Sequence, residues 1–260
     1  EQGAPRAREV LRHERGSITE KSRTVHGIFL LEETAWPLGT LSGGVRLEHA
    51  RVDSAGDADP AAPQFGAPAQ RSFSLRSVSL GNVWKFAPAW SLATTLSSTE
   101  RAPTSFELYA NGVHAATGAF ERGDASLGAE RGRNLDAALQ WAAGHSSMRV
   151  GVFEARFSRF INLSATGATV DVVAEDGSVE AVPEYLFRPV RARLRGIEAQ
   201  AKHRLDAGAW SFDLSGQLDL VRADDLSAGE PLPRIAPARV RSGLDAVTGP
   251  WTASVELDHA

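Results

Sequence analysis

Three side chains with metal-binding chemistry lie close together in one polar stretch of the sequence, residues 99–133. They are His114, Glu121 and Asp124. Imidazole nitrogen and carboxylate oxygen are both suitable zinc ligands, and three such groups in one loop can converge without any thiolate. His114, Glu121 and Asp124 are therefore candidate metal ligands. The alternative is that they only keep a long loop solvated, as polar residues do in most surface loops.

No motif in the sequence points to catalysis. The nucleophile elbow G-x-S-x-G, the zinc-protease motif H-E-x-x-H and the glycine-rich phosphate and dinucleotide loops are all missing. Cysteine is also absent, which excludes a disulfide framework, a thiolate metal site and a cysteine nucleophile. We therefore expect no enzyme and no resident cofactor. A hydrolase built from scattered Asp, His and Ser side chains is the alternative, because such triads are recognised by geometry.

The charge pattern argues against nucleic acid as a partner. Lysine and arginine together number 28 against 32 acidic residues, which gives a net charge of −4. The basic residues are scattered among acids, whereas a nucleic-acid interface needs a clustered basic face. The mean hydropathy is −0.21, and no apolar run approaches the roughly 18 residues of a membrane-spanning helix. This excludes a helical membrane protein.

The strongest structural signal is a period-two alternation of apolar and polar residues, which is typical of strands with two different faces. Between positions 210 and 222, Trp210, Phe212 and Leu214 fall on one face, and Ser211 and Asp213 fall on the other. Such strands approach the roughly 9 to 11 residues that a tilted strand needs to cross a bilayer. The sequence predicts about ten of them: Thr24–Ala35, Thr40–Val52, Ser72–Lys85, Ala89–Ser98, Asn134–Trp141, Met148–Asn162, Arg191–Leu205, Trp210–Arg222, Pro237–Ala246 and Trp251–Asp258.

The segments between these strands alternate between short and long. Long connections are expected at Asp53–Arg71, Thr99–Arg133, Leu163–Val190 and Ala223–Ala236, with short turns between them. Transmembrane barrels have this asymmetry, with tight periplasmic turns and long external loops. We therefore expect an all-β fold, an antiparallel transmembrane β-barrel that is partial here.

Five of the six tryptophans are expected at the end of the sheet where the short turns lie. In a membrane barrel they would form the aromatic girdle at the periplasmic interface. The alternative is that they are ordinary aromatic residues at strand ends. The five are Trp36, Trp90, Trp141, Trp210 and Trp251.

An R-x-P-x-x-x-E-L-Y pattern is formed by Arg101, Pro103, Glu107, Leu108 and Tyr109, with Gly112 following. This pattern resembles a motif of TonB-dependent outer-membrane receptors. Three later segments also match, and the matches run in family order from about residue 72 to the end. These segments are Leu127–Arg131, Leu194–Ala199 and Pro231–Arg239. The loop that starts at His114, and its spacing to the acids after it, looks closest to the zinc-uptake branch.

The resemblance implies an outer-membrane receptor of a Gram-negative cell that takes up a scarce nutrient, with zinc or a metal chelate as transported substrate. It implies partners in the outer-membrane lipid, in the small-molecule or metal cargo, and in the TonB complex of the inner membrane. Such a receptor has about 22 strands and an internal plug. Residues 1–260 are therefore expected to be a fragment of the barrel domain, without the plug and the C-terminal strands. The alternative function is a soluble all-β binding module without transport activity.

Overall fold

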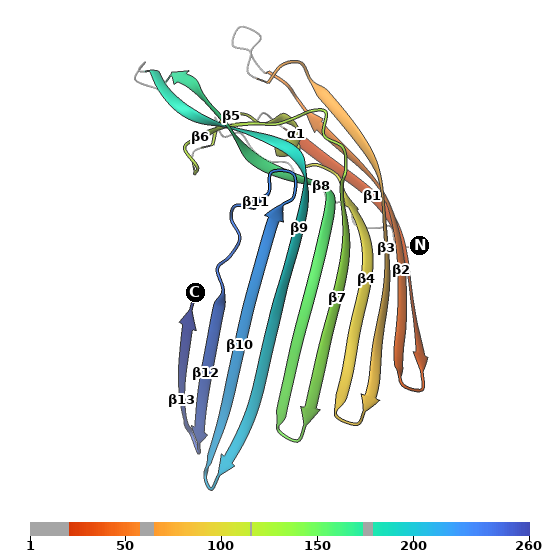
Figure 1. The fold of residues 1–260 in the computed structure, drawn as a ribbon, viewed down its shortest axis with the longest axis vertical. Helices are drawn as coiled ribbons and strands as arrows, with labels where there is room; N and C mark the ends of the chain where they lie inside the picture. The colour runs from red at the N-terminus through yellow and green to blue at the C-terminus, as the bar shows by residue number, and fades with distance from the viewer. Residues whose placement is uncertain (1–20, 58–64, 115, 174–178) are drawn as a thin grey trace.

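The computed structural model describes residues 21–57, 65–114, 116–173 and 179–260, which form one curved antiparallel sheet with a short helix beside it (Figure 1). No helix in these residues is long and apolar enough to cross a membrane. The main strands are β1 (Lys21–Trp36), β2 (Gly39–Ser54), β3 (Ala69–Ala87), β4 (Trp90–Arg101), β7 (Glu130–Ala143), β8 (Ser146–Val173), β9 (Val179–Ala207), β10 (Trp210–Asp225), β12 (Arg239–Thr248) and β13 (Trp251–His259).

All ten strands expected from the alternation pattern are confirmed. They pair in chain order, each antiparallel to the next, so that β1 and β13 lie at the two edges of the sheet. Among the described residues these edges are not paired with each other, and the sheet is a partial barrel rather than a closed one. The fold is therefore the all-β antiparallel barrel type that the sequence predicts.

The register gives the sheet an apolar face and a polar face. Directly paired residues share a face, as in the rung Leu80, Leu96 and Leu135 across β3, β4 and β7. One residue further along, Ser97 pairs with Asn134, and the Asn134 amide donates to the Ser97 hydroxyl at 3.1 Å. A slip of one residue would exchange the two faces, so the hydrophobic pattern fixes the register.

The five expected short connections are all tight hairpins. The strand registers close on the pairs Trp36–Gly39, Ala87–Trp90, Ala143–Ser146, Ala207–Trp210 and Thr248–Trp251, which leaves a two-residue turn in each case. Three of these turns begin with a glycine of positive φ, at Gly144, Gly208 and Gly249. This backbone conformation favours two-residue hairpins because it matches the strand twist.

The tryptophans lie at the end of the sheet where these turns are, and they are on the apolar face. Trp90 pairs directly with Trp141, while Trp36, Trp210 and Trp251 flank their own turns. Trp84 pairs with Gly39 beside the first turn, so the sixth tryptophan also belongs to this row. Stacked and tilted ring contacts continue the row from Trp84 through Phe86 to Trp90 and Trp141.

The long connections lie at the other end of the sheet, and one of them differs from expectation. The expected loop Leu163–Val190 is mostly strand, because β8 continues to Val173 and β9 begins at Val179. The β-branched residues on this stretch, such as Thr169 and Val170, favour an extended backbone. The β4–β7 connection contains α1 (Ser105–Tyr109), β5 (Asn111–His114) and β6 (Ala119–Arg122), and the β10–β12 connection contains β11 (Glu230–Pro231).

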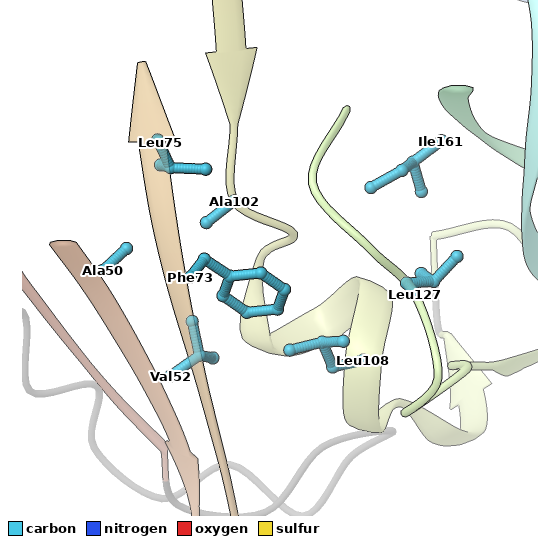
Figure 2. Packing of buried hydrophobic residues seen from close by; sticks show 8 residues of the cluster. All are labelled: Ala50, Val52, Phe73, Leu75, Ala102, Leu108, Leu127 and Ile161. Carbon is cyan, nitrogen blue, oxygen red and sulfur yellow. The ribbon is translucent and has the colours of Figure 1, made fainter. Parts of the chain in front are cut away.

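The main hydrophobic core lies where the β4–β7 connection folds back onto the polar face of β2 and β3 (Figure 2). Leu108 of α1 and Leu127 are each 2% exposed. They face Phe73 on β3 and Val52 on β2, where the alternation places apolar residues on the otherwise polar face. This core fixes the position of the connection that carries the candidate metal ligands.

We expect Leu108→Ala to release α1 from the sheet without unfolding the strands. Truncating a buried leucine costs about 2–5 kcal/mol, and here the loss falls on the connection alone. Limited proteolysis of the detergent-solubilised protein should show new cleavage between residues 102 and 130. Leu38→Ala, in the exposed first turn, is the matched control. Equal protease resistance of the two variants would contradict this account of the core.

Candidate functional site

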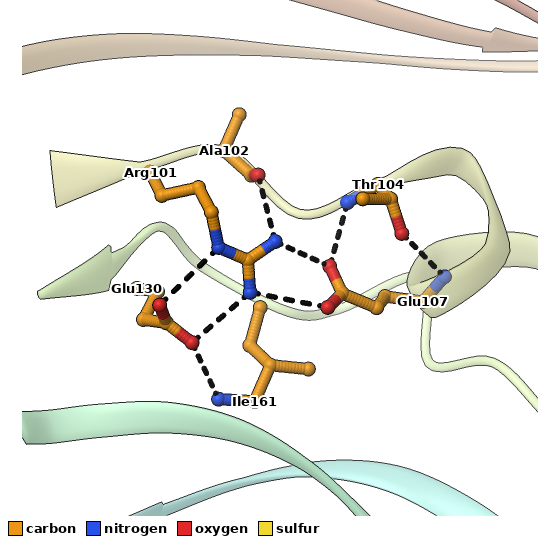
Figure 3. Close-up of polar contacts among 6 residues, drawn as sticks. All are labelled: Arg101, Ala102, Thr104, Glu107, Glu130 and Ile161. Atoms are coloured by element: carbon orange, nitrogen blue, oxygen red, sulfur yellow. Dashed lines mark hydrogen bonds and ion pairs between the residues drawn. The ribbon is translucent and has the colours of Figure 1, made fainter. Parts of the chain in front are cut away.

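The β4–β7 connection begins and ends at an ion-pair network centred on Arg101 (Figure 3). Arg101 closes β4 and pairs in register with Glu130, the first residue of β7. Its guanidinium donates to both carboxylate oxygens of Glu130 at 3.2 and 3.0 Å. It also donates to both oxygens of Glu107 at 2.9 and 3.1 Å. Such two-pronged contacts use the planar geometry of arginine, which lysine lacks.

The Glu130 and Glu107 carboxylates also accept hydrogen bonds from backbone N–H groups on either side of Arg101. The Ile161 N–H of β8 donates to Glu130 at 3.0 Å. Glu107 accepts from the Thr104 N–H at 2.7 Å, and the Thr104 hydroxyl accepts from the Glu107 N–H at 3.2 Å. This reciprocal pair is a capping box, which satisfies the free N–H groups at the start of α1. Thr104 and Glu107 stand at the capping-box spacing, so this signal was present in the sequence.

The residues of the family motif thus lie in α1 and directly beside it in the chain. Pro103 and Leu108 are buried, and Gly112 pairs with Glu121 in the hairpin that follows the helix. Burial raises the pKa of the Tyr109 hydroxyl above its ordinary value, against an opposing effect of Arg71. Through the hydrogen bonds of Arg101 and Glu107 and the burial of Pro103 and Leu108, these residues hold the connection in place.

The hairpin formed by β5 and β6 is attached to the long arm of β9. Phe120, Glu121 and Arg122 pair in parallel with residues 184–186 of β9. Arg122 donates to Glu184 at 3.0 Å, which ties the hairpin to the arm through side chains as well. This contact joins residues that are 62 positions apart in the chain. No local sequence signal indicates it.

His114 and Glu121, two of the three candidate metal ligands, are in contact across this hairpin. The His114 Nδ1 atom lies 3.2 Å from Glu121 Oε1. The Thr117 hydroxyl donates to the same oxygen at 3.0 Å. The Glu121 side chain is only 3% exposed, whereas that of His114 is 43% exposed. Phe106 of α1 packs against the imidazole with ring centres 5.8 Å apart.

This contact determines which imidazole nitrogen is available to a ligand. An ionised carboxylate accepts hydrogen bonds and cannot donate them, so the contact requires the proton on Nδ1. In the neutral imidazole the Nε2 atom then keeps its lone pair. A carboxylate behind a histidine is the common arrangement for a metal-binding imidazole, because it fixes the tautomer and raises the basicity of the ligand. In this contact the Glu121 carboxylate can orient the His114 imidazole.

Asp124 lies in a separate turn. Its side chain accepts from the Ser126 N–H at 2.8 Å and from the Ser126 hydroxyl at 2.6 Å. The Asp124 backbone N–H donates to the backbone carbonyl oxygen of Glu107. Within the described residues no group of three or more His, Cys, Asp or Glu side chains is arranged to hold a metal ion. The structure therefore brings His114 and Glu121 together but does not add Asp124 to them.

We expect Arg101→Lys to loosen the β4–β7 connection even though the charge is kept. Hydrogen bonds to charged groups contribute about 1.5–3 kcal/mol, and solvent screening of the partly exposed Arg101 lowers the expected loss to about 1–2 kcal/mol. Amide hydrogen exchange of residues 102–130 should accelerate. Arg131→Lys is the control, since Arg131 holds Glu100 through one ion pair on the neighbouring rung. The same exchange rates in both variants would refute the role of the guanidinium fork.

Comparison with known proteins agrees with this architecture. Residues 5–259 match the family model described as TonB dependent receptor-like, beta-barrel. Among solved structures, the copper transporter OprC superposes with a TM-score of 0.72 at 23% identity, and the match covers 92% of this chain and 35% of that chain.

Two further solved structures give the same result. The hemophore receptor HasR of Serratia marcescens, in complex with its hemophore HasA and heme, gives a TM-score of 0.68 at 17% identity, over 94% of this chain and 44% of that one. The FrpB iron transporter from Neisseria meningitidis gives 0.53 at 14% identity, over 88% and 31%. The chain spans less than half the length of each of these proteins. Because the family model matches almost the whole chain and the sheet shares the fold of these receptors, the chain belongs to the TonB-dependent receptor-like β-barrel family.

Proposed function

We propose that this chain is part of a receptor in the outer membrane of a Gram-negative cell that takes up a metal ion or metal chelate, with zinc as the first candidate. Family membership supports the receptor class. The three structural neighbours are described as a copper transporter, a receptor bound to heme through its hemophore, and an iron transporter. Their cargoes all contain a metal. The proposed partners are the cargo, the surrounding lipid and the TonB complex that energises such receptors.

The apolar face of the sheet is the observation that supports residence in a membrane. Leu80, Leu96 and Leu135 are 59, 54 and 50% exposed and lie side by side on β3, β4 and β7. One rung nearer the short turns, the exposed Val152 and Ile197 continue the apolar face on β8 and β9. In water this face would be a large apolar patch of the kind that drives aggregation. A soluble binding module would explain the strands, but it would not explain a continuous apolar face bordered by tryptophans at one end.

Membrane residence predicts opposite results for two neighbouring residues of β10. Leu214 lies on the apolar face and Ser215 on the polar face. We expect Leu214→Arg to cost about 2–4 kcal/mol of folding free energy in a bilayer, and Ser215→Arg to cost little. Folding into phospholipid vesicles, followed by urea titration, measures both. Equal stability of the two variants, or a monomer that stays soluble without detergent, would favour the soluble module.

The chemistry at His114 favours a metal chelate over a free ion. The available Nε2 atom supplies one ligand, whereas zinc in proteins usually takes four. A chelate that leaves a coordination position open can accept this nitrogen and bring its other ligands with it. The orienting carboxylate of Glu121 and the edge contact with Phe106 hold the imidazole in place for this role.

The test is calorimetric titration of the full-length protein in detergent with zinc chloride and, separately, with zinc nitrilotriacetate. We expect tighter binding of the chelate, with affinity lost in His114→Ala. Glu121→Gln should weaken binding 10- to 100-fold, as removing a carboxylate behind a metal-bound histidine typically does.

Asp124→Asn should bind as the unmodified protein does, because the Asp124 side chain is committed to its own turn. His145→Ala, on a short turn at the opposite end of the sheet, is the histidine control. Equal losses in Asp124→Asn and His114→Ala would instead support the three-ligand site expected from the sequence. Unchanged binding in His114→Ala would remove the site and leave the receptor class intact.

A further inference from the structure

Arginines are concentrated on the apolar face of the sheet, at the end away from the short turns. One rung crosses five strands from β4 to β10, and three of its members are arginines on adjacent strands, each directly opposite the next. In order the rung is Ser98, Arg133, Arg156, Arg193 and Asp224. Like charges directly opposite each other destabilise a sheet. The arrangement therefore calls for a counter-charge.

The carboxylates on the same face do not supply enough of it. The neighbouring rung on the side of the short turns is Leu96, Leu135, Glu154, Arg195 and Arg222. Glu154 binds Arg156 at 2.7 Å, and Asp224 lies 3.2 Å from Arg193 and 3.8 Å from Arg195. Five arginines thus meet two carboxylates in these two rungs, which leaves three positive charges. Arg133 and Arg222 make no ion pair with any residue that the structure describes.

The position of these rungs along the strands places them at a membrane boundary. On β4, the distance from Trp90 to Ser98 corresponds to about 26 Å of extended strand at about 3.3 Å per residue. A strand tilt of about 35–45° reduces this to about 20 Å along the membrane normal, close to the roughly 25 Å apolar band of membrane barrels. The long arginine side chains can extend from there into the headgroup layer opposite the tryptophan row.

A hollow on this face joins the charged rung to apolar surface. It has a volume of about 1110 Å³, and its lining combines guanidinium groups with leucines of the apolar band. The side chains that line it include Leu80, Leu96, Arg133, Leu135, Glu154 and Arg156. A ligand that fills it must be anionic at one end and apolar along the rest.

We infer that this hollow binds a phosphorylated lipid of the outer leaflet, with its phosphate on Arg133 and Arg156 and its acyl chains along Leu96 and Leu135. Guanidinium groups bind phosphate through paired hydrogen bonds. Basic side chains at a membrane surface attract anionic headgroups. The Glu154 carboxylate binds the Nε atom of Arg156, and both side chains line the hollow. The inference rests on the membrane residence proposed above, and it does not depend on which cargo is transported.

The experiment is native mass spectrometry of the full-length protein in detergent, titrated with lipid A and with dephosphorylated lipid A, which has the same acyl chains. We expect lipid A to bind at least tenfold more tightly than the dephosphorylated form. The double variant Arg133→Gln/Arg156→Gln should lose this difference. Arg149→Gln is the matched control, because Arg149 is on the same strand as Arg156 but on the polar face, in register with Gln140 and Gln200.

Each other outcome counts against the inference. Equal binding of the two lipids, or the same loss in Arg149→Gln, would show that the arginine rung does not recognise phosphate. Inorganic phosphate that binds as tightly as lipid A would show an ion site without a lipid. A thermal unfolding scan verifies that the variants are folded. Normal lipid binding together with failed cargo uptake would refute the proposed function alone.

Discussion

The antiparallel register is the constraint on which the rest of this structure depends. Five two-residue hairpins set it at one end, and from there each rung determines which side chains share a face. The leucines, the tryptophan row and the arginine rungs lie on one face because the side-chain period of a strand is two. A backbone in lipid must also have its polar groups paired, and the ladder does this for the strands between the edges β1 and β13.

Arginines at the end of the sheet away from the short turns have two different environments. On one side, Arg101 is surrounded by Glu107 and Glu130, and its hydrogen bonds fix the β4–β7 connection. On the apolar face, Arg133 and Arg156 are directly paired across β7 and β8, and Glu154 on the neighbouring rung binds Arg156. The guanidinium of Arg101 has its hydrogen-bond partners within the chain, and its role is structural. The arginines of the apolar face retain excess positive charge, so they can accept an anion from outside.

Much of the fold could be predicted from sequence because the signals that carry it are local. Alternation defines the ten main strands, and the turn residues between Trp36 and Gly39 or between Thr248 and Trp251 define their ends. The length of β8 and β9 could not be predicted in this way. The residues beyond Asn162 become strand because the two arms pair with each other as far as Val173 and Val179, and such pairing depends on a partner.

The sequence by itself determined the strands, their two faces, the turn end marked by tryptophan, and the segment that carries His114, Glu121 and Asp124. It could not determine which of these three side chains meet. The β5–β6 hairpin brings His114 to Glu121, while a local turn uses Asp124 for its own backbone. The arginine rungs likewise exist only in the folded sheet, since Arg133, Arg156 and Arg193 come from three strands. Contacts between strands depend on register and tertiary packing, and these are not local properties of the sequence.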